Sequence, residues 1–263
     1  MKKISLLGAF FMMAIMLFTS CLGEGSNEDT RKAVGIVRFD SQSSKFVLDT
    51  SPFGTVYSPV FNSPEMAYNE GACYLLELTV NYDLLENSPE AINSNGFYTV
   101  IVNWKYEVDR YAIYGGSSID TSTVLTNEIP IIDPLLSIDG YVKGVLFFQH
   151  GVEKSDDQSI SCRLTYDMES MFTEEGQERI YDVFLRATKN TEGTKTPSKA
   201  AIASAYDMKY YLESAARKEA DEKNTRVNLR LNYASEIKDG KITWKKTEKI
   251  PIDVTLILPN QSN

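Results

Sequence analysis

Two long segments of the chain alternate apolar and polar side chains. In residues 71–82 and again in residues 97–108, the even-numbered positions are apolar or aromatic, whereas polar residues such as Glu77 and Asn103 take odd-numbered positions. This alternation is typical of β-strands with one face on a core and the other in water. Because Trp104 and Tyr106 share the apolar phase of their strand, we expect both side chains to lie in the core.

Shorter apolar runs predict further strands along the chain. They are residues 33–39, 45–48, 54–61, 111–114, 141–149, 160–166 and 180–187. The first two flank the polar residues 40–44 and predict a hairpin. Residues 83–96, between the two long strands, form a long connection for a hairpin, and such loops are often binding sites.

The alternation becomes clear again near the end of the chain. Val227, Leu229, Leu231 and Tyr233 alternate with polar residues, and Asp239-Gly240 is a dipeptide that favours a two-residue hairpin turn. We therefore expect residues 226–237 to pair with a return strand over 241–258. The apolar face of that return strand would consist of Ile250, Ile252, Val254, Leu256 and Leu258. Pro251 falls on the other phase and indicates an edge or a bulge.

One segment has helical rather than strand spacing. Strong helix formers dominate residues 207–223, and Met208, Tyr211, Leu212 and Ala215 recur at helical intervals. Asp207 is an acceptable N-cap. Thr196-Pro197 could instead start the helix earlier, but residues 200–206 could equally be extended. The pattern favours one helix between two strands of the second β domain.

The first residues have the pattern of a lipoprotein signal peptide. A basic start at Lys2 and Lys3 precedes an apolar run over residues 4–18, which is shorter than the about 20 residues of a membrane-spanning helix. Small residues and Cys21 follow, so that Phe18-Thr19-Ser20-Cys21 resembles the bacterial lipobox. In that motif a peptidase cuts before the cysteine, which then carries lipid. The alternative is an ordinary signal peptide with a coincidental cysteine.

The remaining chain divides into two β domains by composition. We expect a signal peptide at 1–20, a polar lipidated tether at 21–32, a first β domain at 33–115, and a second β domain at 126–263 with a helix near 207–223. The Gly-, Ser- and Thr-rich residues 116–125 would be the linker. Both domains are long enough to bury a core.

The net charge argues against one class of binding partner, and the cysteine content raises the possibility of a disulfide. Removing residues 1–20 takes away two lysines, so the formal charge of −9 becomes −11. An acidic chain repels phosphate backbones, which excludes nucleic acid as a favoured partner. Cys73 and Cys162 are candidates for a disulfide, which the cell envelope permits. Each could also be a small buried apolar residue.

The layout resembles the NigD-like lipoproteins of Bacteroidetes. The residues that carry the resemblance are the Cys21 anchor, residues 45–49 (KFVLD) before 54–59 (GTVYSP), the long strand at 71–82, and the late strand at 227–233 (VNLRLNY). The resemblance implies an OB-like β-barrel followed by an immunoglobulin-like β-sandwich, here with one inserted helix. It also implies an envelope protein, first associated with a bacteriocin operon, without an assigned activity or catalytic residue.

The chain offers little support for catalysis. Its single histidine, His150, would have to serve any Ser–His–Asp site, yet no Gly-x-Ser-x-Gly motif, metal-ligand motif or nucleotide-binding loop is present. We therefore predict no catalytic, cofactor or metal residues, and interpret His150 as a strand-end residue facing solvent or neighbouring backbone. Carboxylates gather at Asp156-Asp157, Asp167 with Glu169, Glu174-Glu175, and Glu219 with Asp221 and Glu222. They are interpreted as solvated surface.

Two functions remain open. The first is a non-catalytic binding or structural module of the outer membrane, facing the periplasm or the cell surface, with a protein, peptide or glycan ligand. Trp244, among Lys241, Lys245 and Lys246, is a candidate ligand contact, although packing over its strand pair is the alternative. The second function is a glycan-acting hydrolase that uses paired carboxylates about 5–10 Å apart across a cleft.

Overall fold

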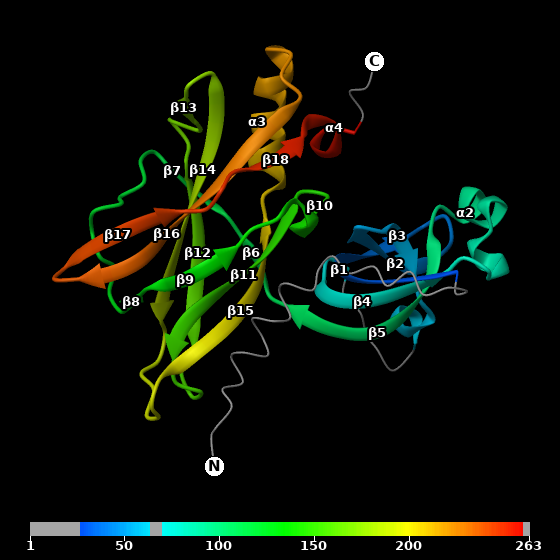
Figure 1. Cartoon of the computed structure of the whole chain (residues 1–263), viewed down its shortest axis with the longest axis horizontal. Helices are drawn as coiled ribbons and strands as arrows, with labels where there is room; N and C mark the ends of the chain where they lie inside the picture. The colour runs from blue at the N-terminus through cyan, green and yellow to red at the C-terminus, as the bar shows by residue number, and fades with distance from the viewer. Residues whose placement is uncertain (1–26, 64–69, 260–263) are drawn as a thin grey trace. The chain divides into compact units, whose positions relative to one another are not determined.

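The computed structural model describes residues 27–63 and 70–259, in two compact units that divide between Val108 and Asp109 (Figure 1). The predicted signal peptide and Cys21 lie outside the described residues. Each unit is described by itself below. No helix among the described residues is long and apolar enough to cross a membrane.

The first unit is a closed five-stranded barrel, as the family resemblance implies. Its strands are β1 (Glu28–Asp40), β2 (Lys45–Ser51), β3 (Gly54–Tyr57), β4 (Cys73–Asn81) and β5 (Tyr98–Val108), with a 3₁₀ turn, η2 (Pro59–Asn62), after β3. Neighbouring strands follow the order β1-β2-β3-β5-β4, and β4 pairs with β1 to close the ring. The ring has no open edge between its terminal strands, so its interior is one apolar core.

The even-numbered residues of β4 fill this core as predicted. Tyr74, Leu76, Leu78 and Val80 are buried, together with Phe61 of η2. The first half of β5 follows the same rule, since Val100 is buried. The predicted inner face is therefore confirmed from Tyr74 to Val80, whereas Tyr82, at the end of the predicted strand, lies beyond β4 and is 41% exposed.

The second half of β5 departs from the prediction. Glu77 of β4 pairs with Trp104, whereas the next residue, Leu78, pairs with Val102, so that Asn103 is an extra residue on β5. A bulge of this kind reverses which side chains face inward. Trp104 and Tyr106 therefore lie on the outside of the barrel, and the prediction that they belong to the core is wrong.

The barrel begins earlier than the predicted tether allows. β1 starts at Glu28 and pairs with the end of β4, where Thr30 and Thr79 share a hydroxyl hydrogen bond of 2.7 Å. Residues 28–32 lack apolar alternation because they lie at the rim of the barrel, where both side-chain phases are largely exposed. Part of the expected tether is thus the first strand.

The long connection between β4 and β5 is folded rather than extended. It contains the 3₁₀ turn η3 (Leu85–Asn87) and the helix α2 (Pro89–Asn95). The Ser88 hydroxyl caps α2 by accepting the Ala91 amide, and Gly96 ends it in the left-handed conformation that glycine adopts readily. Buried Asn87 bonds to the backbone of Asn81 and Thr99, which fixes the connection to both strands.

The second unit has two sheets. One consists of β6 (Arg110–Ala112), β9 (Ile131–Leu135), β10 (Tyr141–Val142), β11 (Val145–Lys154) and β15 (Ser198–Asp207). The other consists of β7 (Tyr114–Gly116), β8 (Glu128–Ile129), β12 (Ile160–Asp167), β13 (Thr173–Glu175), β14 (Glu178–Lys189), β16 (Arg226–Lys238), β17 (Lys241–Lys246) and β18 (Ile250–Asp253). A 3₁₀ turn, η4 (Ile138–Gly140), precedes β10. Strands of both sheets contribute to one apolar core.

The segment expected as a linker belongs to this unit. β6 pairs with β15 and β7 pairs with β12, so the run expected as a strand of the first domain lies in the second. Buried Arg186 of β14 donates to the carbonyls of Asp120 and Thr123 and pairs with buried Glu128 at 2.6 Å. The Gly- and Ser-rich composition indicated a flexible linker, but these bonds hold residues 120–128 on the sheet.

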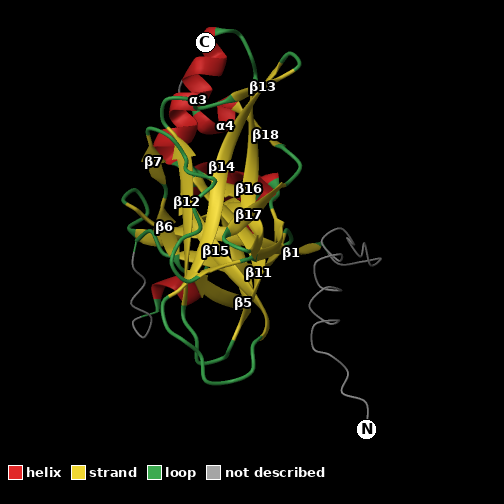
Figure 2. Cartoon of the chain, turned by 90° about the vertical axis from the view of Figure 1, so that its left-hand side faces the viewer, coloured by secondary structure: helices red, strands yellow, loops and turns green. Residues whose placement is uncertain are grey.

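The helix forms close to its predicted position. α3 covers Lys209–Asp221, and Tyr211, Leu212 and Ala215 are buried on its inner face. Met208, not Asp207, is the N-cap residue. The alternative for residues 200–206 is correct, since they belong to strand β15. Figure 2 shows α3 and the short α4 (Val254–Ile257) together at one end of the strands.

The terminal hairpin is confirmed in part. β16 pairs antiparallel with β17 and then with β18, and the turn at Asp239-Gly240 has the positive φ angles that its type requires. The inward face of β16 is buried as predicted. The return strand, however, ends at Asp253, because the Asp253 carboxylate caps α4 by accepting the Thr255 amide. Leu256 is consequently 57% exposed rather than part of a strand face.

We predict that Leu229→Asp unfolds the second unit, because it would place an unpaired charge in a fully buried position. The loss in the free energy of unfolding should be at least about 3 kcal/mol. Urea unfolding followed by circular dichroism measures it. Leu256→Asp is the matched control and should change stability by less than about 0.5 kcal/mol. Equal stability of both variants would show that the assigned inner face of β16 is wrong.

Candidate functional site

The carboxylates of the predicted clusters have different local partners in the second unit. Asp157 accepts the hydroxyl and amide of Thr194, which lowers its pKa. Asp167 accepts the amides of Glu169 and Ser170 in a turn. These two carboxylates are local structural acceptors.

Glu219 corrects the surface interpretation. It lies on the inner side of α3, is buried, and accepts the Tyr181 hydroxyl at 2.5 Å and the Asn224 amide at 2.6 Å. Arg179 lies 3.6 Å from the same carboxylate. Glu219 therefore ties the helix to β14 and does not face solvent.

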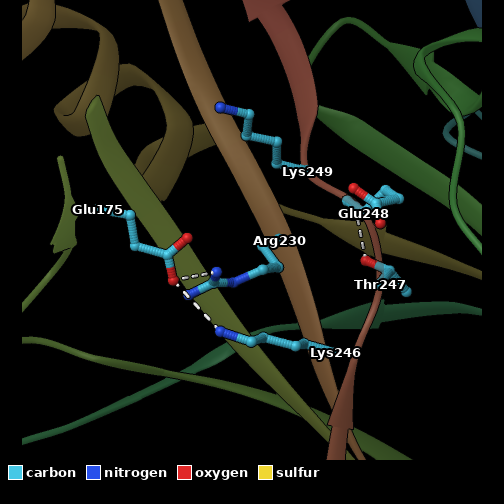
Figure 3. Close-up of a pocket in the computed structure, with 6 residues that line it drawn as sticks. All are labelled: Glu175, Arg230, Lys246, Thr247, Glu248 and Lys249. Atoms are coloured by element: carbon cyan, nitrogen blue, oxygen red, sulfur yellow. Dashed lines mark hydrogen bonds and ion pairs between the residues drawn. The ribbon is translucent and has the colours of Figure 1, made fainter. Parts of the chain in front are cut away.

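Glu175 is the cluster member that lines a pocket. The pocket has a volume of about 270 Å³ and lies where β17 gives way to β18 (Figure 3). It is lined by Glu175, Arg230, Lys246, Thr247, Glu248 and Lys249. Three of these side chains are basic and two are acidic, so the pocket is polar and nearly balanced in charge.

The pocket exists because the terminal strand is interrupted. Thr247 donates its amide to the Leu231 carbonyl, and its hydroxyl accepts the Leu231 amide. Thr247 thus replaces a regular strand pairing at the gap between β17 and β18, and the residues around it line the opening in Figure 3. The polar run 245–249, which breaks the terminal alternation, was the available sequence signal for this gap.

Arg230 is the fixed centre of the pocket. Its side chain is only 9% exposed, and two of its nitrogens donate to the Asp182 carboxylate at 2.7 and 2.9 Å. A third nitrogen, Nη1, donates to Glu175 at 2.5 Å, and Lys246 Nζ lies 3.2 Å from the same Glu175 oxygen. Figure 3 shows both cations directed toward one oxygen of the Glu175 carboxylate.

This geometry favours an ionised carboxylate. Hydrogen bonds from Arg230 and then Lys246 lower the pKa of Glu175, while the bonds to Asp182 raise the pKa of Arg230. A general acid for glycoside hydrolysis needs a raised pKa. Glu175 is shifted in the opposite direction, so the pocket is suited to ion pairing rather than proton donation.

A second feature lies on the barrel. Ile101, Trp104 and Tyr106 face outward along β5 and are 56%, 52% and 56% exposed. The two rings are within 8° of parallel, with centroids 6.3 Å apart. Asn103 holds the bulge by donating its amide to the Thr79 hydroxyl at 2.8 Å. We call these three apolar residues the β5 row.

Trp244 follows the packing alternative rather than the ligand-contact prediction. Its indole N–H donates to the Thr121 carbonyl at 2.8 Å, and its ring meets Phe184 edge to face at 5.7 Å. Arg186 lies over the same ring at 5.8 Å. Trp244 therefore covers the outer face of β14 and holds the segment before β8.

His150 is not at a strand end. β11 continues to Lys154, and His150 is 2% exposed on the inner face of its sheet. Its Nε2 lies 3.2 Å from Cys162 Sγ, and Nδ1 has no hydrogen-bond partner among the described residues. Burial lowers the pKa of His150 to about 4 and raises the pKa of Cys162 to about 12. A neutral imidazole therefore lies beside a protonated, unreactive thiol.

The predicted alternative of a Cys73–Cys162 disulfide is not present among the described residues. Cys73 is buried in β4 of the barrel and Cys162 in β12 of the second unit. Cys162 belongs to the apolar core of the second unit, whereas Cys73 is buried but is not among the residues that form the barrel core. Both are small buried residues, which is the other reading of the sequence. The described residues also contain no group of three or more side chains able to hold a metal ion.

Comparison with known proteins gives a domain family and a fold. Residues 25–106 match the family model "Lipoprotein OB domain", and no curated protein sequence matches the chain. Among solved structures, an uncharacterized protein from Parabacteroides merdae has a TM-score of 0.71 at 22% identity, over 85% of this chain and 98% of that one. A putative lipoprotein from Bacteroides fragilis has a TM-score of 0.55 at 11% identity, over 85% and 98%.

Residues 25–106, which include the barrel, are thus similar to the OB domains of lipoproteins. Over the part of the chain that this match covers, the fold is similar to that of the Parabacteroides merdae protein. A NigD-like immunity protein from Bacteroides caccae also matches, with a TM-score of 0.42 at 10% identity over 82% and 91%, which is too distant to support an argument. The resemblance to lipoproteins of this group is confirmed at the level of the OB domain.

We predict that acid destabilises the second unit through His150. Its folded pKa of about 4 lies below the unfolded value of about 6.5, so the unfolded chain takes up this proton first as pH falls. This contribution to the free energy of unfolding is fully present above about pH 6.5. It decreases by about 3 kcal/mol in total as pH falls from about 6.5 to about 4. Urea unfolding of wild type and His150→Leu at several pH values measures the difference, since carboxylates titrate in both chains. A wild-type-minus-variant difference that stays constant from pH 7 to 4.5 would contradict the prediction.

Proposed function

We propose that the chain is an outer-membrane lipoprotein, anchored through lipid on Cys21, that acts as a non-catalytic binding module for a protein, peptide or glycan. The observation that carries this proposal is the β5 row, in which three large apolar side chains lie more than half exposed in one line. Contiguous exposed apolar residues on a soluble domain mark interaction surfaces, whereas isolated ones do not. Trp and Tyr are also the residues that most often dominate binding energy at interfaces.

The bulge supports a role for the row. A regular β5 would turn Trp104 and Tyr106 inward, into the core with Val100. The extra residue Asn103 instead keeps Ile101 and both rings on the same outer side, and its bond to Thr79 stabilises that arrangement. Bulges that re-aim side chains are common near functional sites.

The hydrolase alternative has less support. It needs one carboxyl group with a raised pKa and a second that remains ionised. The carboxylate in the pocket with a resolved shift, Glu175, has a lowered pKa because Arg230 and Lys246 donate to it. We therefore favour binding.

We also infer that the second domain is an immunoglobulin-like β-sandwich. Support comes from its two sheets, which enclose one core between them. The parallel pairing of β14 with β16 and the helix α3 are additions to such a sandwich. The connection that contains α3 lets β16 run parallel to β14 in the same sheet.

The binding proposal predicts that Trp104→Ala/Tyr106→Ala loses ligand capture while the fold is kept. The chain without its signal peptide would be immobilised and exposed separately to a detergent extract of bacterial envelopes and to purified cell-wall glycan. The double variant should retain at least about tenfold less material in one of these two experiments, because aromatic anchors contribute most of the affinity.

The matched control is Tyr210→Ala, which removes an exposed ring on α3 of the other unit and should not change capture. The chain has two tryptophans, so Trp244→Phe leaves Trp104 as the single reporter, and its fluorescence should shift to the blue when ligand binds. Unchanged capture by the double variant, or turnover of the glycan, would overturn the proposal.

The anchor gives a separate prediction. Cys21→Ala removes the sulfur at which lipid would be attached, so the variant should remain an uncut precursor or be released without lipid. Mass spectrometry of the native protein should find acyl mass on a peptide that begins at Cys21. A mature N-terminus at another residue, without lipid, would refute the localisation.

A further inference from the structure

The pocket around Arg230 holds a charge arrangement that the β5 row does not explain. Arg230 is buried and held by Asp182, and Asn232 donates a further hydrogen bond to Asp182 at 2.6 Å. The guanidinium is therefore fixed in place, with Nη1 directed into the pocket toward Glu175. A fixed Arg donor beside a Lys is the arrangement that proteins use for a carboxylate.

The Glu175 carboxylate now pairs with Arg230, but β13, the strand that carries Glu175, is itself weakly held. Glu175 is the last residue of β13, whose three residues are all exposed, and its side chain is 49% exposed. Among the described strands, β13 pairs with β14, through a hairpin that turns at Gly176, and its Thr173 hydroxyl donates to the Asp182 carboxylate at 2.9 Å. Short exposed hairpins open at low free-energy cost, so the Glu175 carboxylate can leave while Arg230 stays.

The charges around the pocket limit how much negative charge a group that replaces Glu175 can carry. Asp182 already neutralises Arg230, and Lys249 is paired with Glu178. Exchanging the Glu175 carboxylate for another single carboxylate leaves the balance unchanged. A group with more negative charge would be repelled by Glu248, which lines the same pocket.

We propose that the Arg230 pocket is a binding site for a single carboxylate group, and that the Glu175 side chain occupies it until a ligand carboxylate displaces it. Arg230 Nη1 and Lys246 Nζ would donate to the ligand as they now donate to Glu175. The pocket volume of about 270 Å³ accommodates a small acid or one acidic side chain. The carboxylate could come from a free acid or from a peptide, because the recognised chemistry is the same.

Glu175→Gln is the decisive variant, since it removes the competing charge and keeps the shape. Binding of sodium acetate and of a blocked peptide with one glutamate would be measured by NMR titration of the full chain, at constant ionic strength set with chloride. Affinity for at least one probe should rise about tenfold, because an occupied site lowers apparent affinity by the fraction that is open. The same peptide with glutamine is the negative probe.

Neighbouring residues supply matched controls. Glu174→Gln lies on the opposite phase of β13 and should bind like wild type, whereas Lys246→Met added to Glu175→Gln should remove the gain. Lys245→Met, one position earlier on β17, should not. If the peptide binds and acetate does not, the ligand carboxylate belongs to a peptide. If acetate binds, the pocket accepts a free acid.

In wild type, saturating probe should shift the side-chain resonances of Arg230 and Lys246 but not that of Lys245, a test that does not depend on any variant folding. The proposal is overturned if Glu175→Gln binds neither probe more tightly than Glu174→Gln does. It is also overturned if the gain survives loss of Lys246. Neither result bears on the β5 row, which lies on the other domain.

Discussion

The ion pair between Asp182 of β14 and Arg230 of β16 is the interaction on which the second domain's larger sheet depends. The two strands run parallel, and this pair lies side by side in their register. A buried charge is tolerated only when it is partnered, and breaking such a pair costs about 3–5 kcal/mol. The pair therefore fixes how β14 and β16 align.

The same requirement explains the rest of the outer face of β14. Arg186 lies four residues after Asp182 on the same face of β14. It forms an ion pair with buried Glu128 and donates to carbonyls of the segment before β8. Phe184, between them, is covered by Trp244. β14 is thus covered on both faces. Side chains on its outer face contact three other parts of the chain, namely the β13 hairpin, the segment after β7 and the terminal hairpin.

A different constraint, the closure of its strands into a ring, governs the barrel. Its strands close into a ring, so every strand must satisfy the same inward phase. The extra residue at Asn103 breaks that phase on β5 without opening the ring, since β4 and β5 remain paired on either side of it. The outcome is a closed apolar core with aromatic side chains on the outside. The barrel therefore carries the exposed apolar β5 row, and the second domain carries the charged Arg230 pocket.

Four features can be predicted from the amino-acid pattern: the lipoprotein signal, the β class of both domains, the inner faces of β4 and β16, and the helix α3. These features depend on local periodicity and composition, which a linear chain displays directly. Three features follow instead from how the strands pack together: Trp104 and Tyr106 face outward, His150 and Glu219 are buried, and residues 120–128 are held on a sheet. Each of these involves a partner on another element: β4 for the bulge, Cys162 beside His150, Tyr181 for Glu219, and Arg186 for the supposed linker. The pocket has the same origin, because Glu175, Arg230 and Lys246 meet only when β13, β16 and β17 are brought together.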